Sequence, residues 1–130
     1  MDVSNQPLVS VVIPAFNERP DMITDAINSI LQQTYSNIEL HIFDDSTKEE
    51  TKAAIDVFSA DSRVNIHRSE SRVGFIKSLN LGLEAAKGQY IARMDGDDFS
   101  HPDRFEKELA FLESHPDVMV VGGQMNIMDE

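Results

Sequence analysis

The stretch Val9-Ser10-Val11-Val12-Ile13-Pro14-Ala15-Phe16-Asn17-Glu18 decides the fold class of this chain. Its first five residues are mostly β-branched and Pro14 ends the run, a pattern that predicts a short buried strand rather than a helix. Residues 21–33 then carry apolar side chains at helical spacing: Met22, Ile23, Ala26, Ile27, Ile30 and Leu31. A buried strand followed at once by an amphipathic helix begins a crossover unit, so this opening predicts an α/β protein.

The same alternation continues along the chain. Apolar runs predict further strands at residues 38–43, 64–67, 90–94 and 118–121. Helical spacing predicts helices at residues 47–58, 75–87 and 100–112. Strands that alternate with helices form crossover connections, so we expect one mainly parallel sheet, Rossmann-like, with helices on both faces.

Local signals also predict where the helices begin and end. Asp21 is a candidate N-cap, Thr47 opens a capping-box pattern, and Gly88 stands where a helix C′ residue is expected. The expected inward positions of the second helix are Ala53, Ala54, Val57 and Phe58. Those of the third helix are Ile76, Leu79, Leu83 and Ala86.

Composition narrows the class of protein. With 130 residues the chain is long enough for one domain with a real core. It has no cysteine, which excludes disulfides and thiolate metal sites. A net charge of −12 argues against nucleic-acid binding, which depends on basic contacts to phosphate. An anionic ligand such as a nucleotide would need a metal ion between it and these acidic residues.

No apolar run approaches the roughly 20 residues that span a bilayer, and the N-terminus lacks the basic and apolar regions of a secretory signal. We therefore expect no membrane span in this chain. We expect the protein in the cytoplasm, either free or at the inner face of the membrane.

Acidic residues follow two of the predicted strands. Ligands of open parallel sheets bind beyond the carboxyl ends of the strands, so these positions are candidates for function. Asp95, Gly96 and Asp97 place two carboxylates in a compact turn, with Asp98 as a third charge. Oxygen ligands without sulfur favour Mg²⁺ or Mn²⁺. Like charges about 4 Å apart cost about 4 kcal/mol at an effective dielectric near 20, which a bound cation would offset. The alternative is that these aspartates only form a turn.

The other strand ends leave alternatives open. One carboxylate of Asp44 and Asp45 could accept the ring N–H of a base while the other caps the next helix, or both could cap that helix. Phe16 could cover a base or belong to the core. Asn17 and Glu18 could reach a ribose or only solvate the turn.

Basic residues near these acids are few. Lys77 lies on the predicted third helix and Arg72 in the loop before it. Either could meet a phosphate, although most lysines on helix surfaces are simply solvated.

Taken in order, these segments resemble glycosyltransferase family 2, which has the GT-A fold. The resemblance is carried by Val9 through Glu18, Ser29-Ile30-Leu31-Gln32-Gln33-Thr34-Tyr35, Asp44-Asp45-Ser46-Thr47, Gly74 through Gly82, Gly88 through Ala92, Met94 through Asp98, and Pro102-Asp103-Arg104-Phe105. It covers nearly the whole chain, and although each piece is common, the ordered set is specific.

The resemblance implies a UDP-sugar or similar donor, a divalent metal, and an inverting displacement on a glycan or lipid-linked acceptor, in cell-surface polysaccharide synthesis. It implies metal ligation by Asp95 and Asp97. It also implies that Pro14, Phe16 and Glu18 line the nucleoside pocket, that Asp45 contacts the base and that Asp95 contacts the ribose or sugar. With the candidates from the residues themselves, the expected nucleotide-binding set is Pro14, Ala15, Phe16, Asn17, Glu18, Asp44, Asp45, Lys77, Asp95 and Gly96. The catalytic base and the acceptor-binding portion of the family lie later than residue 130, so the chain is expected to be a single donor-binding domain cut before them.

Two other classes remain open at this point. A phospho-acceptor receiver domain has the same alternation and paired acids in a similar length. A non-catalytic nucleotide-binding module would also need no catalytic base. Autophosphorylation of Asp95 would favour the receiver, whereas metal-dependent UDP binding would favour the transferase.

Overall fold

All four strands of the sheet run parallel, in the order β3-β2-β1-β4. The computed structural model describes residues 6–122 of the chain. The strands are β1 (Val9–Ala15), β2 (Ile38–Asp44), β3 (Val64–His67) and β4 (Tyr90–Arg93). The helices are α1 (Pro20–Leu31), α2 (Glu49–Asp56, continued by the 3-10 turn Val57–Ala60), α3 (Phe75–Ala85) and α4 (Arg104–Ser114).

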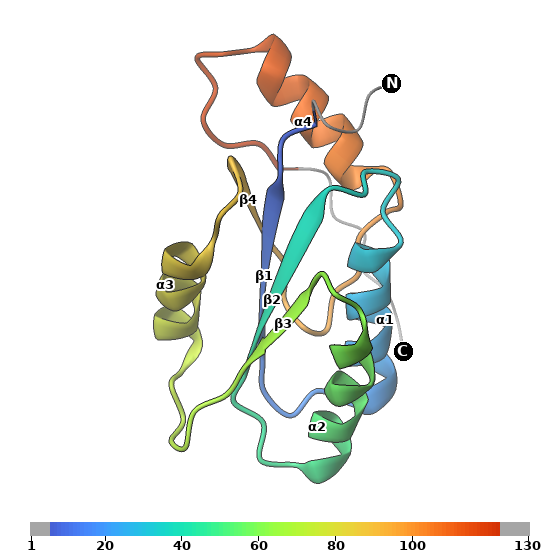
Figure 1. The fold of residues 1–130 in the computed structure, drawn as a ribbon, viewed down its shortest axis with the longest axis vertical. Helices are drawn as coiled ribbons and strands as arrows, with labels where there is room; N and C mark the ends of the chain where they lie inside the picture. The colour runs from blue at the N-terminus through green and yellow to red at the C-terminus, as the bar shows by residue number, and fades with distance from the viewer. Residues whose placement is uncertain (1–5, 123–130) are drawn as a thin grey trace.

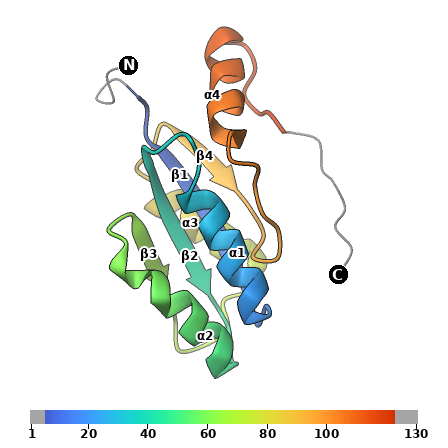
Figure 2. The ribbon, with the colours of Figure 1, turned by 90° about the vertical axis from the view of Figure 1, so that its right-hand side faces the viewer.

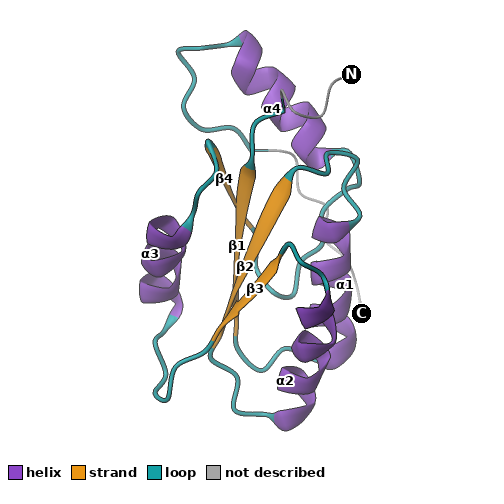
Figure 3. Ribbon diagram, viewed as in Figure 1, coloured by secondary structure: helices purple, strands orange, loops and turns teal. Residues whose placement is uncertain are grey.

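The sheet separates two helical layers. Helices α1 and α2 cover one face and α3 covers the other, as Figures 1 and 3 show. Helix α4 lies near the end of the sheet where the strands begin (Figure 2). There Gln33, just after α1, accepts a hydrogen bond from the Phe105 N–H at 3.1 Å. The predicted α/β architecture with helices on both faces is therefore confirmed.

The main core lies between the sheet and α1. Alternate residues of β1 and β2 face this side, among them Val11, Ile13, Leu40 and Ile42, all fully buried. Helix α1 contributes the predicted residues Ile23, Ala26, Ile27 and Ile30, which are also fully buried. Burying an aliphatic side chain of this size stabilises the fold by roughly 1.5–3 kcal/mol, so this layer fixes the sheet on which the strand ends depend.

The α3 side is packed through small residues. Ser78 and Gly82 are the buried residues of α3. A Cβ on Gly82 would lie 2.6 Å from Val12 Cγ1, so the helix approaches β1 at a distance that only glycine permits. The predicted inward face of α3 was wrong at Ile76 and Leu83, which are 74% and 54% exposed. The close approach at Gly82 turns the helix so that these side chains point outward.

A polar network also lies on the α3 side of the sheet. The Glu39 carboxylate accepts hydrogen bonds from the Ser10 hydroxyl at 2.5 Å and the Lys87 N–H at 2.8 Å. His41 Nε2 is 3.2 Å from Glu39, and His41 Nδ1 is 2.9 Å from His67 Nε2. Burial raises the pKa of Glu39, but the hydrogen-bond donors and His41 outweigh it and hold that pKa below its usual range. The network ties β1, β2 and β3 to the end of α3.

Several predicted helix boundaries were wrong. Helix α1 has Arg19 as its N-cap residue and Asp21 in its first turn, and α2 begins after Lys48 rather than at Thr47. Helix α3 has Ala86 as its C-cap, two residues before Gly88. Helix α4 begins at Arg104, because residues 100–103 stay in the loop after β4, where the His101 carbonyl accepts a hydrogen bond from Gln33 Nε2.

Two predicted apolar features also differ in the structure. Ala53 and Val57 are exposed, because the face of α2 that meets the core is formed by Thr51 and Ile55. The helix continues as a 3-10 turn from Val57. Residues 118–121 form no strand, and Met119 is 91% exposed. An apolar run becomes a strand only where a neighbouring edge supplies hydrogen-bond partners, and none of the described residues does so here.

Candidate functional site

One pocket of about 240 Å³ lies at the carboxyl ends of β1, β2 and β4. Nine residues singled out from the sequence line it: Pro14, Ala15, Phe16, Glu18, Asp45, Arg72, Asp95, Gly96 and Asp97. Gly74, Phe75 and Ser78, at the start of α3, complete the lining. Segments more than 80 residues apart in the sequence therefore meet where parallel sheets bind ligands.

The acidic cluster consists of Asp95, Asp97 and Asp98. One carboxylate oxygen from each lies within 4.8 Å of the others. Burial raises the pKa of Asp98, and the charges of Asp97 and Asp95 raise it further. Three carboxylates without a nitrogen or sulfur donor fit a hard divalent cation such as Mg²⁺ or Mn²⁺. The cluster contains the two predicted ligands and adds Asp98.

Glu18 brings a fourth carboxylate close to this cluster. Its Oε1 accepts a hydrogen bond from the Phe16 N–H at 2.8 Å. A Cβ on Gly96 would lie 2.9 Å from Glu18 Oε2, so the glycine leaves room for this carboxylate. Burial raises the pKa of Glu18 despite its backbone hydrogen bonds, and nearby Asp97 and Asp44 raise it further. The site therefore concentrates negative charge, as expected of a place where a cation binds.

Asp45 fixes the entrance to α3. Its Oδ2 accepts hydrogen bonds from the Val73 N–H at 3.0 Å and the Gly74 N–H at 2.7 Å. Gly74 has φ +88°, a conformation that glycine adopts without strain. The hydrogen bonds found for this carboxylate within residues 6–122 use Oδ2, which leaves Oδ1 available to a ligand in the pocket.

Asp44 and Lys77 lie outside the residues that line this pocket. The Asp44 side chain is fully buried, its Oδ2 is 2.9 Å from Arg68 Nε, and its Oδ1 accepts the Ser46 N–H. Lys77 is exposed on α3. Asp44 therefore has a structural role, as the buried partner of Arg68 and Ser46, which its place at a strand end in the sequence does not reveal.

Asn17 ties two of the site loops together. It has φ +56°, and its Oδ1 accepts the Thr47 N–H at 2.8 Å and the Lys48 N–H at 2.9 Å. Its own N–H donates to Ser46 Oγ at 2.9 Å. Asn17 therefore holds, from another loop, the two residues that lead into α2. The N-cap residue of α2 is Lys48, and the cap predicted from Asp44, Asp45 or Thr47 is not among the hydrogen bonds that the described residues make at this helix start.

Comparison with known proteins identifies the fold family. A model of glycosyl transferase family 2 matches residues 10–130. The chain belongs to this family. The sheet order also excludes the receiver domain, in which the third strand pairs with the first, whereas here β4 does.

Three known proteins illustrate the likeness of this family 2 chain. It is 34% identical to the amylovoran biosynthesis glycosyltransferase AmsE of Erwinia amylovora, over 95% of this chain and 47% of AmsE. It matches S. aureus TarS 1-349 in complex with UDP-GlcNAc at a TM-score of 0.74 and 25% identity, over 83% of this chain and 32% of TarS 1-349. It shares the fold of the mannosyltransferase PcManGT of Pyrobaculum calidifontis, solved with GDP-Man and Mn²⁺, at a TM-score of 0.73 and 22% identity, over 85% and 34% of the two chains.

The family 2 chain spans less than half the length of the curated relatives it matches, between 40% and 47% for three of them. Within residues 6–122, no helix combines the length and apolar character needed to cross a membrane.

Arginine–aromatic pairs at this site were not predicted from the sequence. The Arg72 guanidinium lies 3.9 Å above the centre of the Phe16 ring, and that of Arg93 lies 4.7 Å from the centre of the Phe75 ring. Arg93 Nη2 is also 3.4 Å from Asp95 Oδ1. The available signal was weak: the position of Arg93 two residues before Asp95, at the end of a strand.

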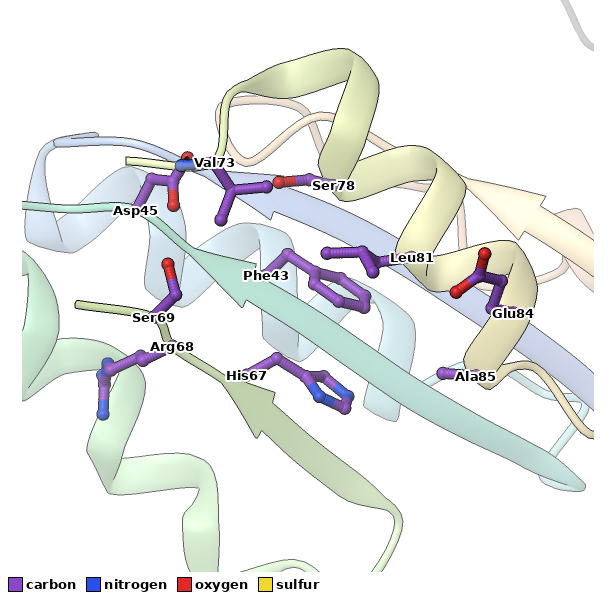
Figure 4. A pocket seen from close by; sticks show the side chains of 10 residues that line it. All are labelled: Phe43, Asp45, His67, Arg68, Ser69, Val73, Ser78, Leu81, Glu84 and Ala85. Atoms are coloured by element: carbon purple, nitrogen blue, oxygen red, sulfur yellow. Dashed lines mark hydrogen bonds between the residues drawn. The ribbon is translucent and has the colours of Figure 1, made fainter. Parts of the chain in front are cut away.

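A second, larger pocket of about 380 Å³ adjoins the first and shares Asp45 and Ser78 with it. Figure 4 shows it between α3 and the ends of β2 and β3, with Phe43 and His67 on the strands and Leu81 and Ala85 on α3. The Phe43 and His67 rings are stacked, with centres 4.4 Å apart. This pocket is more apolar and lacks the carboxylate cluster, so the smaller pocket is the better candidate for nucleotide chemistry.

Proposed function

We propose that this family 2 chain binds a nucleotide-diphosphate sugar in the smaller pocket and takes part in transferring the sugar to an acceptor. The observation that carries the proposal is the meeting of Asp45 with the acidic cluster in one pocket at the strand ends. A nucleoside and a metal-bound diphosphate need these two features side by side.

Asp45 and Phe16 are proposed to hold the nucleoside. One carboxylate oxygen of Asp45 is held by the Val73 and Gly74 N–H groups just before α3, so the other is in a fixed position to accept the ring N–H of a uracil. Phe16 lines the pocket and is 40% exposed. Because the Arg72 guanidinium lies over one face of its ring, the part of the ring that stays exposed is proposed to meet the base.

Asp95, Asp97 and Asp98 are proposed to hold Mg²⁺ or Mn²⁺. When bound, the cation would neutralise negative charge on the leaving diphosphate. Arg72, the basic residue among the pocket-lining residues, is placed to meet the same anionic group. Positive charge in the pocket is needed because the chain has a net charge of −12 and several carboxylates line the pocket. Without the cation and Arg72, these carboxylates would repel the diphosphate of the donor.

The donor class, inversion of configuration and the acceptor are further parts of the proposal. TarS, solved with UDP-GlcNAc, supports a UDP-sugar, and AmsE supports a role in polysaccharide synthesis on a glycan or lipid-linked acceptor. A general base that removes the acceptor proton would complete a single displacement. A cytoplasmic location at the inner face of the membrane stays a prediction.

The test is calorimetric titration of UDP, GDP and UDP-sugars into the chain, with and without Mn²⁺, repeated on Asp97→Ala. We expect tight binding only with Mn²⁺, and loss of at least about tenfold in affinity in the variant, as for other deleted charge contacts. Asp103→Ala is the matched control, because Asp103 pairs with Lys107 on α4 and lies outside the pocket.

Equal affinity in wild type and Asp97→Ala would contradict the assignment of the cation site. Binding that does not depend on Mn²⁺ would favour a non-catalytic nucleotide-binding module instead.

A further inference from the structure

Arg93 lies beside the acidic cluster on the α3 side of the sheet. It is in register with Val12, whose side chain meets Gly82 of α3, so both side chains point to that face. Its guanidinium reaches the Phe75 ring and Asp95 Oδ1, at 4.7 Å and 3.4 Å. The side chain is 53% exposed. Arg93 is therefore a cation at the rim of the pocket, supported by an aromatic ring.

The charges around Arg93 are unbalanced. Glu18, Asp45, Asp95 and Asp97 line the pocket, and Arg72 is the basic residue that lines it. A divalent cation arriving alone must compete with Arg93 for Asp95 and meets the repulsion of its charge. A diphosphate arriving with the cation instead adds negative charge that a guanidinium binds well.

We infer that Arg93 is a positioning residue that couples cation binding to diphosphate binding. In the free protein it holds Asp95 and weakens the binding of the cation alone. Once Asp95 turns to the cation, the guanidinium, still resting on Phe75, binds the anionic part of the donor. This inference rests on the proposed function and adds to it a residue that favours the cation and the donor together.

The test compares wild type with Arg93→Gln in two titrations, Mn²⁺ alone and UDP in saturating Mn²⁺. We expect effects of opposite sign: Mn²⁺ alone binds roughly two- to fivefold more tightly and UDP binds roughly two- to fivefold more weakly, the range for a partly exposed charge pair. Because binding linkage is reciprocal, the factor by which UDP tightens Mn²⁺ binding should fall accordingly.

Two variants serve as controls. Lys107→Gln makes the same change in net charge at an exposed ion pair on α4 and should leave both affinities unchanged. Arg93→Lys keeps the charge but not the planar group that lies on Phe75, so its Mn²⁺ affinity should stay near wild type while its UDP affinity falls in between. Arg104 donates to the main-chain oxygen of Arg93, a contact that these substitutions retain, and thermal unfolding checks that each variant folds.

The outcomes separate the two proposals. If wild type binds neither Mn²⁺ nor a nucleotide diphosphate, the proposed function fails. If wild type binds both and Arg93→Gln changes neither affinity, or changes both in the same direction, the inference about Arg93 is overturned and the proposed function stands.

Discussion

Asp98 illustrates, at the scale of one residue, a conflict between folding and ligand binding. Its carboxylate is partly desolvated and close to Asp95 and Asp97, and both causes raise its pKa. An acid whose pKa is raised by folding stabilises the folded state while it is protonated. That stability is lost as the pH rises from the ordinary aspartate range through the raised pKa.

Asp98→Asn is therefore expected to stabilise the cation-free protein at pH 7, raising Tm by about 1–3 °C. The same substitution should weaken Mn²⁺ binding because it removes one carboxylate of the cluster. Differential scanning calorimetry with and without Mn²⁺ measures both effects. A lower Tm without the cation would show that Asp98 stabilises the fold in a way that outweighs the charge repulsion.

The same pKa shift predicts a pH dependence. Cation binding should weaken as the pH falls through the raised pKa of Asp98, because protonation removes the charge of this carboxylate. The loss should start at a higher pH than it would for an ordinary aspartate. Titration of Mn²⁺ between pH 4 and pH 7 by calorimetry tests this. The Asp98→Asn variant should lose this component, and an identical pH profile in both proteins would contradict the assignment.

Residue types predicted much of the site. The acidic turn at 95–98 and the segment after β1 were found because strand ends are where open sheets bind ligands. The roles of Asp44 and Asn17 were not predictable, because their partners lie 24 and about 30 residues away in the sequence. Phe75 was missed because an aromatic at the start of a helix is more often a core residue.

At the scale of single elements, the start of α2 depends on a side chain from another loop, because Asn17 Oδ1 accepts the Thr47 and Lys48 N–H groups just before the helix. Asn17→Ala should destabilise the fold by about 1–2 kcal/mol through loss of these hydrogen bonds, and more because alanine does not favour φ +56°. Asn17→Gly keeps the conformation and loses the side-chain hydrogen bonds, while Asn17→Asp keeps the acceptor oxygen and should cost least. Urea unfolding ranks the three, and equal stability of all variants would contradict the role of Asn17 in holding the start of α2.

Packing of α3 on β1 makes a second prediction at this scale. Gly82→Ala should destabilise the protein by about 1–3 kcal/mol, because its Cβ would overlap the Val12 side chain. Val12→Ala in the same chain should restore part of the loss by opening that space. Chemical denaturation of the single and double variants measures the coupling. Additive effects would show that the two residues do not meet as the structure has them.

Elements themselves were easier to predict than their ends. Buried strands and the α1 stripe follow directly from apolar spacing, since one face of each must leave water. Helix ends depend on which loop reaches them, as at α2 and α4. The segment 118–121 shows the limit of this approach, because β-propensity does not supply a pairing edge.

At the scale of the whole molecule, the excess of acidic residues should govern the response to salt. Raising NaCl should increase Tm by screening repulsion, since the net charge is −12. Mn²⁺ at the same ionic strength should raise Tm further because it binds the folded state. At 100 times its Kd this binding adds about 2.7 kcal/mol to the free energy of unfolding. Thermal unfolding of wild type and Asp97→Ala tests this. The additional Mn²⁺ effect should be absent from the variant, and its persistence there would place the cation elsewhere.

The grip of Asp45 on the start of α3 has a mechanical consequence. One carboxylate touches the place proposed for the base and also restrains Val73 and Gly74, immediately before the ring on which Arg93 rests. A base that seats against Asp45 would stiffen this hinge-like junction. Binding of the base at Asp45 would then favour binding of the diphosphate at Arg93, because residues 73–75 connect the two places. The sheet would not need to move.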